Sequence, residues 1–176
     1  FNGNPAQRKN FPHWDDAAKQ VATLPAAINK CLEANGEKPY KYIKDKKMLA
    51  LLAYMSFESR GQKTAVTVPN ADALAAYNAG KQFYFARRGQ LNFSCAHCHV
   101  ESAGMHVRTD TLSPMLGHTT GFPVYRSKWG SLGTLHRRFV GCNKQVRAKA
   151  FAGQSPEYRN LEYFMSHASN GIEYNG

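Results

Sequence analysis

A short motif near the middle of the chain limits its fold more than any other feature of the sequence. Residues 92–99 read Asn-Phe-Ser-Cys-Ala-His-Cys-His, so Cys95 and Cys98 are separated by two residues and His99 follows directly. Two thiols at this spacing reach both vinyl groups of a haem while the adjacent imidazole binds its iron. The motif therefore predicts one covalently bound haem c with His99 as an axial ligand.

Two other uses of a cysteine pair fit the sequence less well. A zinc site needs further ligands at similar spacing, and neither Cys31 nor Cys142 has a close Cys or His partner, apart from the scattered His136. A thioredoxin-type pair opens a helix after a strand, whereas residues 70–90 have the apolar spacing of a helix. We therefore favour haem attachment.

Composition and charge narrow the class of protein further. The 176 residues are 43% hydrophobic, which is enough for one or two compact domains, and no run of about 18 apolar residues predicts a membrane span. The formal net charge of +11 attracts anions of any kind. The basic residues stand in ones and twos and not in a dense arm, so we expect no nucleic-acid binding.

Two stretches of the chain resemble each other. Residues 11–40 and 122–151 share three anchors at a constant offset of 111, namely Phe11-Pro12, Thr23-Leu24 and Cys31 against Phe122-Pro123, Thr134-Leu135 and Cys142. The similarity continues from residues 51–61 to residues 160–171, with a one-residue deletion. We expect a duplication in which each copy ends in two helices, one with the cysteine and one rich in Leu, Tyr and Met.

The duplicated copies are unequal, because an attachment motif for the first copy would fall before residue 1. We therefore predict an all-α protein of tandem cytochrome c-like domains: a degenerate, truncated or haemless unit over residues 1–67, and a complete unit with one haem over residues 68–176. Pro69, ahead of the next helix, marks the junction. Cys31 is then the odd cysteine, free or paired with a cysteine in an upstream segment.

Sequence spacing alone does not decide which residue is the second axial ligand of the iron. A Met ligand suits an electron carrier, whereas a thiolate lowers the potential and points to chemistry at the iron or sulfur. The candidates are the remaining Met, His and Cys side chains of suitable position: Met105, Met115, His106, His118, His136, His167, Cys31 and Cys142.

Several segments together resemble the SoxA subunits of the SoxAX cytochromes of bacterial thiosulfate oxidation. They are Phe-Ser-Cys-Ala-His-Cys-His at 93–99, Phe-Pro-Val-Tyr-Arg at 122–126, the segment 132–143 and the segment 161–171. The resemblance covers most of the chain and implies a second axial ligand at Cys142, present as a thiolate or persulfide. It also implies a role for Arg138, four residues earlier. On a helix these two side chains share a face, so we expect the guanidinium to lower the pKa of the thiol and to bind an anionic sulfur substrate.

The family resemblance implies a haem-dependent L-cysteine S-thiosulfotransferase. Thiosulfate would join a cysteine thiol of a carrier protein, with Cys142 and Arg138 as catalytic residues and Cys95, Cys98 and His99 holding the haem that takes the electrons. The implied partners are a SoxX-type cytochrome and a SoxYZ-type carrier, and covalent haem of this kind places the protein in the periplasm.

Two alternatives stay open. A thiosulfate dehydrogenase that makes tetrathionate also uses a cysteine-ligated haem, but it typically carries two attachment motifs and this chain has one. A simple electron-carrier cytochrome c would use a Met such as Met115 as the second ligand and would carry out no sulfur chemistry.

Overall fold

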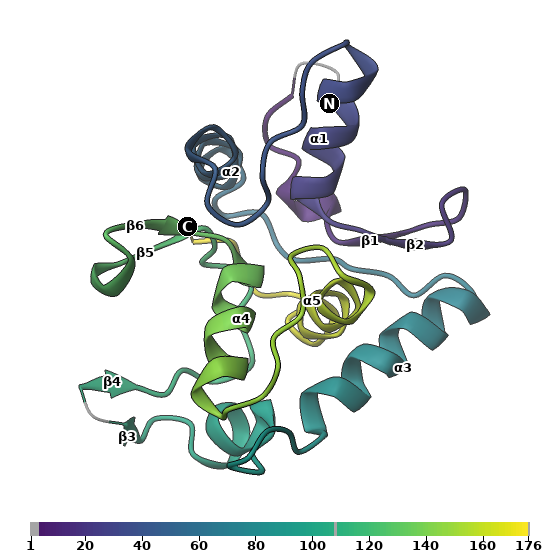
Figure 1. Ribbon diagram of the computed structural model, residues 1–176. Coiled ribbons are helices and arrows are strands. Elements are labelled where there is room, and N and C mark those ends of the chain that lie inside the picture. Colours follow the sequence, from purple (N-terminus) through teal and green to yellow (C-terminus); the bar gives the residue numbers. More distant parts are fainter. Residues whose placement is uncertain (1–3, 108, 176) are drawn as a thin grey trace.

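Helices form most of the ordered structure. The computed structural model describes residues 4–107 and 109–175 (Figure 1). The α-helices are α1 (Leu24–Ala34), α2 (Lys46–Glu58), α3 (Ala71–Phe85), α4 (Leu135–Gln145) and α5 (Pro156–Ala168). Short helical turns are η1 (Arg8–Asn10), η2 (His97–Glu101) and η3 (Ser127–Trp129). The predicted helical core is therefore present, and α3 begins just after Pro69 as expected.

Three small antiparallel hairpins accompany the helices, and the expectation of an all-α chain did not include them. They pair β1 (His13–Asp15) with β2 (Gln20–Ala22), β3 (His106–Val107) with β4 (Asp110–Thr111), and β5 (Val124–Arg126) with β6 (Ser131–Gly133). Strands of two or three residues are too short to show the alternation of apolar and polar residues by which a strand is predicted.

The order hairpin, helix, helix occurs twice along the chain. The elements β1, β2, α1 and α2 are followed later by β5, β6, α4 and α5 in the same order. Helix α4 begins at Leu135, 111 residues after the start of α1 at Leu24, and both helices are capped by a threonine hydroxyl, from Thr23 and Thr134. The two predicted pairs of helices, one with a cysteine and one rich in Leu, Tyr and Met, are thus present.

Helix α3 crosses α5 at a glycine. A methyl group on Gly80 would lie 2.0 Å from the backbone oxygen of Asn160, so only glycine allows the two backbones this close. Tyr84, one turn later on the same face, is fully buried. Gly80 and Tyr84, four residues apart on one face of α3, therefore allow the two helices to pack closely.

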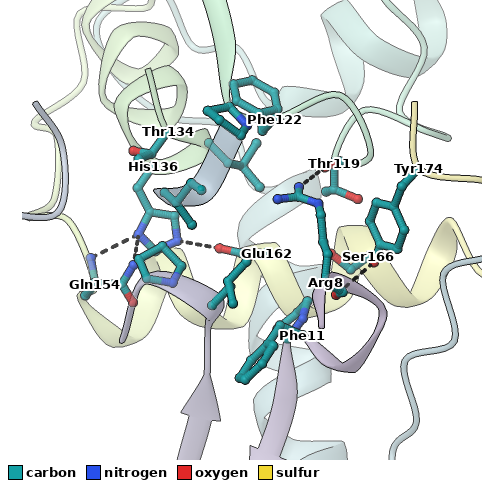
Figure 2. Close-up of a pocket in the computed structure, with 16 residues that line it drawn as sticks. Arg8, Phe11, Thr119, Phe122, Thr134, His136, Gln154, Glu162, Ser166 and Tyr174 are labelled. Atoms are coloured by element: carbon teal, nitrogen blue, oxygen red, sulfur yellow. Dashed lines mark hydrogen bonds and ion pairs between the residues drawn. The ribbon is translucent and has the colours of Figure 1, made fainter. Parts of the chain in front are cut away.

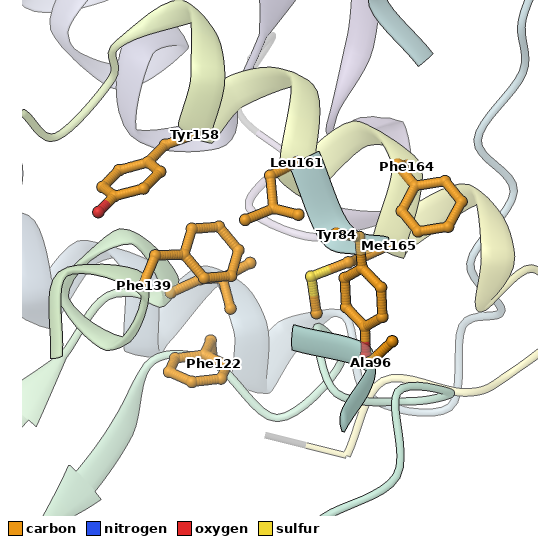
Figure 3. Close-up of a cluster of buried hydrophobic side chains, with 9 residues drawn as sticks. Tyr84, Ala96, Phe122, Phe139, Tyr158, Leu161, Phe164 and Met165 are labelled. Carbon is orange, nitrogen blue, oxygen red and sulfur yellow. The ribbon is translucent and has the colours of Figure 1, made fainter. Parts of the chain in front are cut away.

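The halves of the molecule share their apolar interior. One cluster, drawn in Figure 3, joins α3, α4 and α5 and includes Tyr84, Phe139, Leu161 and Met165. A second cluster lies between α1 and α2, and a third packs Val21 of β2 against Tyr163 of α5. The hairpin of the first half therefore packs on a helix of the second half.

The segment between the halves pairs with the end of the described chain. The Gly61 N–H donates to the Tyr174 carbonyl at 3.1 Å, the Tyr174 N–H donates to the Gln62 carbonyl at 2.9 Å, and the Thr64 N–H donates to the Ile172 carbonyl at 2.9 Å. Nowhere in residues 4–107 and 109–175 is there a helix long and apolar enough to cross a membrane.

Candidate haem site

The cysteine motif lies on a tight helical turn. Cys95 and Cys98 are one turn apart at the start of η2, and the Ser94 hydroxyl lies 2.7 Å from Nδ1 of His97. His97 is thereby turned toward the backbone ahead of the motif. The two thiols are unpaired, and both form part of the wall of one cavity.

That cavity brings together all five residues predicted from the sequence. Cys98 and His99 line it from η2, Cys95 lines it from two residues before η2, and Arg138 and Cys142 line it from α4. The remaining lining is largely apolar and includes Phe83, Leu112, Phe139, Leu161 and Met165. These side chains surround a largely apolar space that is partly open to solvent.

His99 is oriented as a metal ligand is. Its Nδ1 lies 2.7 Å from the Ser113 carbonyl oxygen, so Nδ1 carries the proton and Nε2 presents a free lone pair. The ring is mostly buried, and burial lowers the pKa of His99 below its usual value. A neutral imidazole that is hydrogen-bonded in this way is suited to binding iron.

Cys142 and Arg138 lie one turn apart on α4, as their spacing predicts. Burial raises the pKa of the Cys142 thiol above its usual value, and the positive charges of Arg138 and Arg126 offset only part of this effect. Arg138 thus lowers the pKa of the thiol as expected, but desolvation outweighs the guanidinium, so the pKa of the free thiol is raised overall. A bond between the Cys142 sulfur and a metal ion would stabilise the thiolate more than the charge of Arg138 alone does.

The residues present fit a haem better than a single metal ion. Within residues 4–107 and 109–175, no three His, Cys, Asp or Glu side chains converge on one point as ligands of a single ion do. The donors stand instead around an apolar space, with two thiols on one wall. Burial raises the pKa of Cys95 to about 12, so this thiol is uncharged at neutral pH.

His118 is a site residue that sequence spacing left undecided. It lines the cavity, and its ring centroid lies 4.7 Å from that of His99. Burial and the nearby His99 and Arg138 lower the pKa of His118 to about 4, and its Nδ1 is enclosed without a hydrogen-bond partner among the described residues. Met165 and Tyr84 also line the cavity, and sequence spacing did not identify them as site residues.

Other charged side chains of α4, and two of the candidate iron ligands, lie away from this cavity. Arg137 donates to the Ser131 hydroxyl at 3.0 Å, and its guanidinium lies over Trp129. His136 belongs to a second cavity, shown in Figure 2, where Nε2 lies 3.0 Å from the Glu162 carboxylate. Lys144 is exposed, as is Met105. Of the Met and His candidates for the second axial position, only His118 shares the cavity with Cys142.

Cys31 lies in a third cavity, in the first half of the molecule. This cavity is lined by Gln7, Ala27 and Cys31, which stand 111 residues before His118, Arg138 and Cys142. The first half thus has a hollow in the position that corresponds to the candidate haem site. It offers a cysteine there, but alanine in place of arginine and glutamine in place of histidine.

Comparison with known proteins identifies the family. The family model of the SoxA/TsdA cytochrome c domain matches residues 6–64 and 79–174. The chain is 60% identical to the L-cysteine S-thiosulfotransferase subunit SoxA of Allochromatium vinosum, over 100% of this chain and 63% of the relative. It is 52% identical to the subunit of the same name from Chlorobaculum tepidum, over 100% of this chain and 61% of the relative. The chain therefore spans about three fifths of the length of these curated relatives.

A solved structure gives the same result. A chain of SoxXA from P. pantotrophus superposes with a TM-score of 0.87 at 31% identity, covering 97% of this chain and 65% of that chain. Its similarity extends across both halves, including the hairpins. The chain belongs to the SoxA/TsdA cytochrome c domain family, whose cofactor is haem c.

Proposed function

We propose that this chain is the haem-bearing part of an L-cysteine S-thiosulfotransferase, which attaches thiosulfate to a cysteine of a carrier protein. The observation that carries the proposal is that Arg138 and Cys142 line one cavity with the attachment motif. Two relatives with 60% and 52% identity bear this name. The number of haems is one, because the chain holds a single attachment motif.

Each residue of the cavity has its own role in the proposed reaction. Cys95 and Cys98 would hold the haem covalently, and His99 and Cys142 would bind its iron, with Cys142 as a thiolate or persulfide. The bound haem supplies a place for two electrons to leave, one at a time. Arg138 binds the sulfonate end of thiosulfate through its planar fork of N–H donors, and the sulfur of Cys142 carries the thiosulfate unit before transfer.

The overall reaction balances with an external acceptor. The outer sulfur of thiosulfate forms a bond with the sulfur of the carrier cysteine, and the S–H bond of that cysteine breaks. One proton and two electrons are released. A SoxX-type cytochrome is the proposed electron acceptor, supported by the likeness to a chain of SoxXA, and a SoxYZ-type protein is the proposed carrier. Covalent haem and this chemistry suit the periplasm.

We also propose that residues 1–67 are a degenerate, haemless cytochrome c-like unit and that residues 68–176 are the complete unit. The repeated element order supports this division, and so does the hollow beside Cys31. Ala27 in the position of Arg138 leaves the first hollow without a group for binding a sulfonate. We therefore assign the chemistry to the second unit alone.

Electron paramagnetic resonance of the oxidised protein tests the ligand at the centre of this proposal. Wild type is compared with Cys142→Met, and with Cys31→Ser as the matched control from the corresponding position. We expect a low-spin thiolate signal that disappears only in Cys142→Met, and thiosulfate-dependent turnover that is lost in Cys142→Ser. A signal unchanged by Cys142→Met would instead favour an electron carrier, with His118 or Met165 near the iron.

A second candidate function follows from the family itself, because its model spans both SoxA and TsdA proteins. A thiosulfate dehydrogenase would release tetrathionate from thiosulfate and an electron acceptor without a carrier protein. Product analysis with and without a carrier thiol distinguishes the two. Tetrathionate formed at the same rate in both cases would support the dehydrogenase.

A further inference from the structure

We infer that Arg8, in the first half of the chain, is a positioning residue for the loop that holds His99. The loop consists of residues 113–119 and is called the ligand loop below. The inference rests on the proposed function insofar as His99 is taken as an axial ligand. It assigns the first half a part in the haem site, although the residues that line the candidate haem cavity all come from positions 83–165.

The beginning of the ligand loop is tied to His99 at two points. The Ser113 carbonyl lies 2.7 Å from the His99 Nδ1, and the Met115 N–H donates to the His99 carbonyl at 2.8 Å. Further along the loop, the ring of His118 lies against the ring of His99, with 4.7 Å between centroids. The position of the imidazole therefore depends on where the loop lies.

The end of the ligand loop is held by Arg8. One terminal nitrogen of the guanidinium donates to the Thr119 carbonyl at 2.7 Å (Figure 2). The other donates to the Ser56 hydroxyl at 3.1 Å. Ser56 in turn donates to the Phe122 carbonyl at 3.1 Å. The Thr119 carbonyl at the end of the loop thus takes a hydrogen bond from Arg8, and the Phe122 carbonyl, three residues beyond the loop, takes one from α2.

Arg8 itself is fixed on several sides. Its own N–H donates to the Ser59 hydroxyl at 3.1 Å, and its guanidinium lies 5.2 Å from the ring centre of Tyr174. The cavity in Figure 2 places Glu162 on the same side as Arg8, where its charge complements the guanidinium. Because Arg8 is held by these contacts, the position of the first half determines where the Thr119 carbonyl lies.

The repeat explains why this contact links the halves. Arg8 and Thr119 are 111 residues apart, the same offset that relates Cys31 to Cys142. Corresponding residues of the two copies are therefore in contact. Arg8 of the first copy supplies the guanidinium, and Thr119 of the second copy supplies the carbonyl that accepts its hydrogen bond. A methionine at position 8 would fill similar space but leave the Thr119 carbonyl enclosed without that charged donor.

The test compares haem-loaded Arg8→Met with Lys9→Met, which removes one charge at an exposed neighbouring position. Amide hydrogen exchange is followed by mass spectrometry, together with the reduction potential and the electron paramagnetic resonance signal. In Arg8→Met we expect exchange in the ligand loop to rise about tenfold or more, while α1 exchanges as in wild type. The g-values and the potential should shift, and Lys9→Met should match wild type in all three measurements.

Two results would overturn the role of Arg8: loop exchange and g-values that stay at their wild-type values, or exchange that rises equally in all helices. If Arg8→Met does not fold, Ser56→Ala removes one partner of the guanidinium and the donor to Phe122, and the same loop should respond. The wild-type signal judges the proposed function separately, because it reports whether His99 is a ligand at all. The difference between variants reports on Arg8 whichever side chain is opposite His99.

Discussion

At the scale of single residues, Gly80 fixes the distance between α3 and α5. Gly80→Ala places a methyl group 2.0 Å from a backbone oxygen that cannot turn aside. We expect a loss of about 2–3 kcal/mol in the free energy of unfolding. Gly141→Ala is the matched control, because a methyl group there meets nothing within 4 Å. The control should gain about 0.5–1 kcal/mol from the helix preference of alanine. Urea denaturation of both variants measures this, and equal effects would contradict the close approach.

Arg138 and Lys144 are two positive charges on the same helix, α4, whose effects on thiosulfate turnover can be compared. Arg138→Met should lower kcat/KM for thiosulfate by about tenfold or more, because the guanidinium lines the cavity and forms charge-assisted hydrogen bonds with an anion. Lys144→Met removes the same charge from an exposed position and should change kcat/KM little. Steady-state kinetics at fixed ionic strength separate the two. Equal losses would mean that only the overall charge matters.

Sequence spacing predicted some site residues and missed others for a physical reason. Cys95, Cys98 and His99 are neighbours in the chain, and Arg138 and Cys142 are one helical turn apart, so local geometry is enough to bring each group together. His118, Met165 and Arg8 reach the site region from separate segments. No local pattern marks them, because their proximity depends on how α5, the ligand loop and the first half pack.

At the scale of elements, the hairpin of β1 and β2 carries a carboxylate, that of Asp15, whose contribution to the stability of the fold depends on pH. Asp15 accepts hydrogen bonds from the Ala17 and Ala18 N–H groups at 3.1 and 3.0 Å. The bond from Ala18 is the largest cause that lowers the pKa of Asp15 from 3.8. A carboxylate with a lowered pKa stabilises the folded state above pH 3.8, and this contribution is lost as the pH falls below that value.

Asp15→Asn keeps an oxygen acceptor but removes the charge, so it isolates this effect. We expect the variant to be less stable than wild type at pH 6, and the difference to shrink as the pH falls below 3.8. Thermal melting at several pH values at constant salt measures the difference. A difference that stays constant down to pH 3 would show that the charge of Asp15 does not contribute.

The helices could be predicted as elements more reliably than the hairpins. Apolar periodicity and the capping residues Asn70 and Thr134 mark where α3 and α4 begin. Hairpins of two or three residues per strand carry no such signal. The constant offset of 111 nevertheless anticipated that Phe11 and Phe122, which precede two of the hairpins, lie in corresponding positions.

At the scale of the whole molecule, the net charge of +11 should speed the association of the protein with an anion such as thiosulfate. Attraction between a cationic protein and a dianion weakens as the Debye length falls from about 10 Å at 0.1 M salt to about 3 Å at 1 M salt. We expect kcat/KM for thiosulfate to decrease with added sodium chloride, and kcat to change less. Stopped-flow reduction of the haem by thiosulfate at rising salt measures this. A rate independent of salt would exclude long-range attraction.

The pairing of residues 61–64 with residues 172–174 has a consequence for how the molecule melts. Because the connection between the halves is hydrogen-bonded to the end of the second half, and Val21 packs on Tyr163, one half cannot lose its structure without exposing the other. Calorimetry should therefore show one cooperative transition, with the calorimetric enthalpy equal to the van't Hoff enthalpy. Two resolved transitions would show independent halves. On this account, neither copy of the repeated hairpin and helix pair has a folded state that is separate from the other copy.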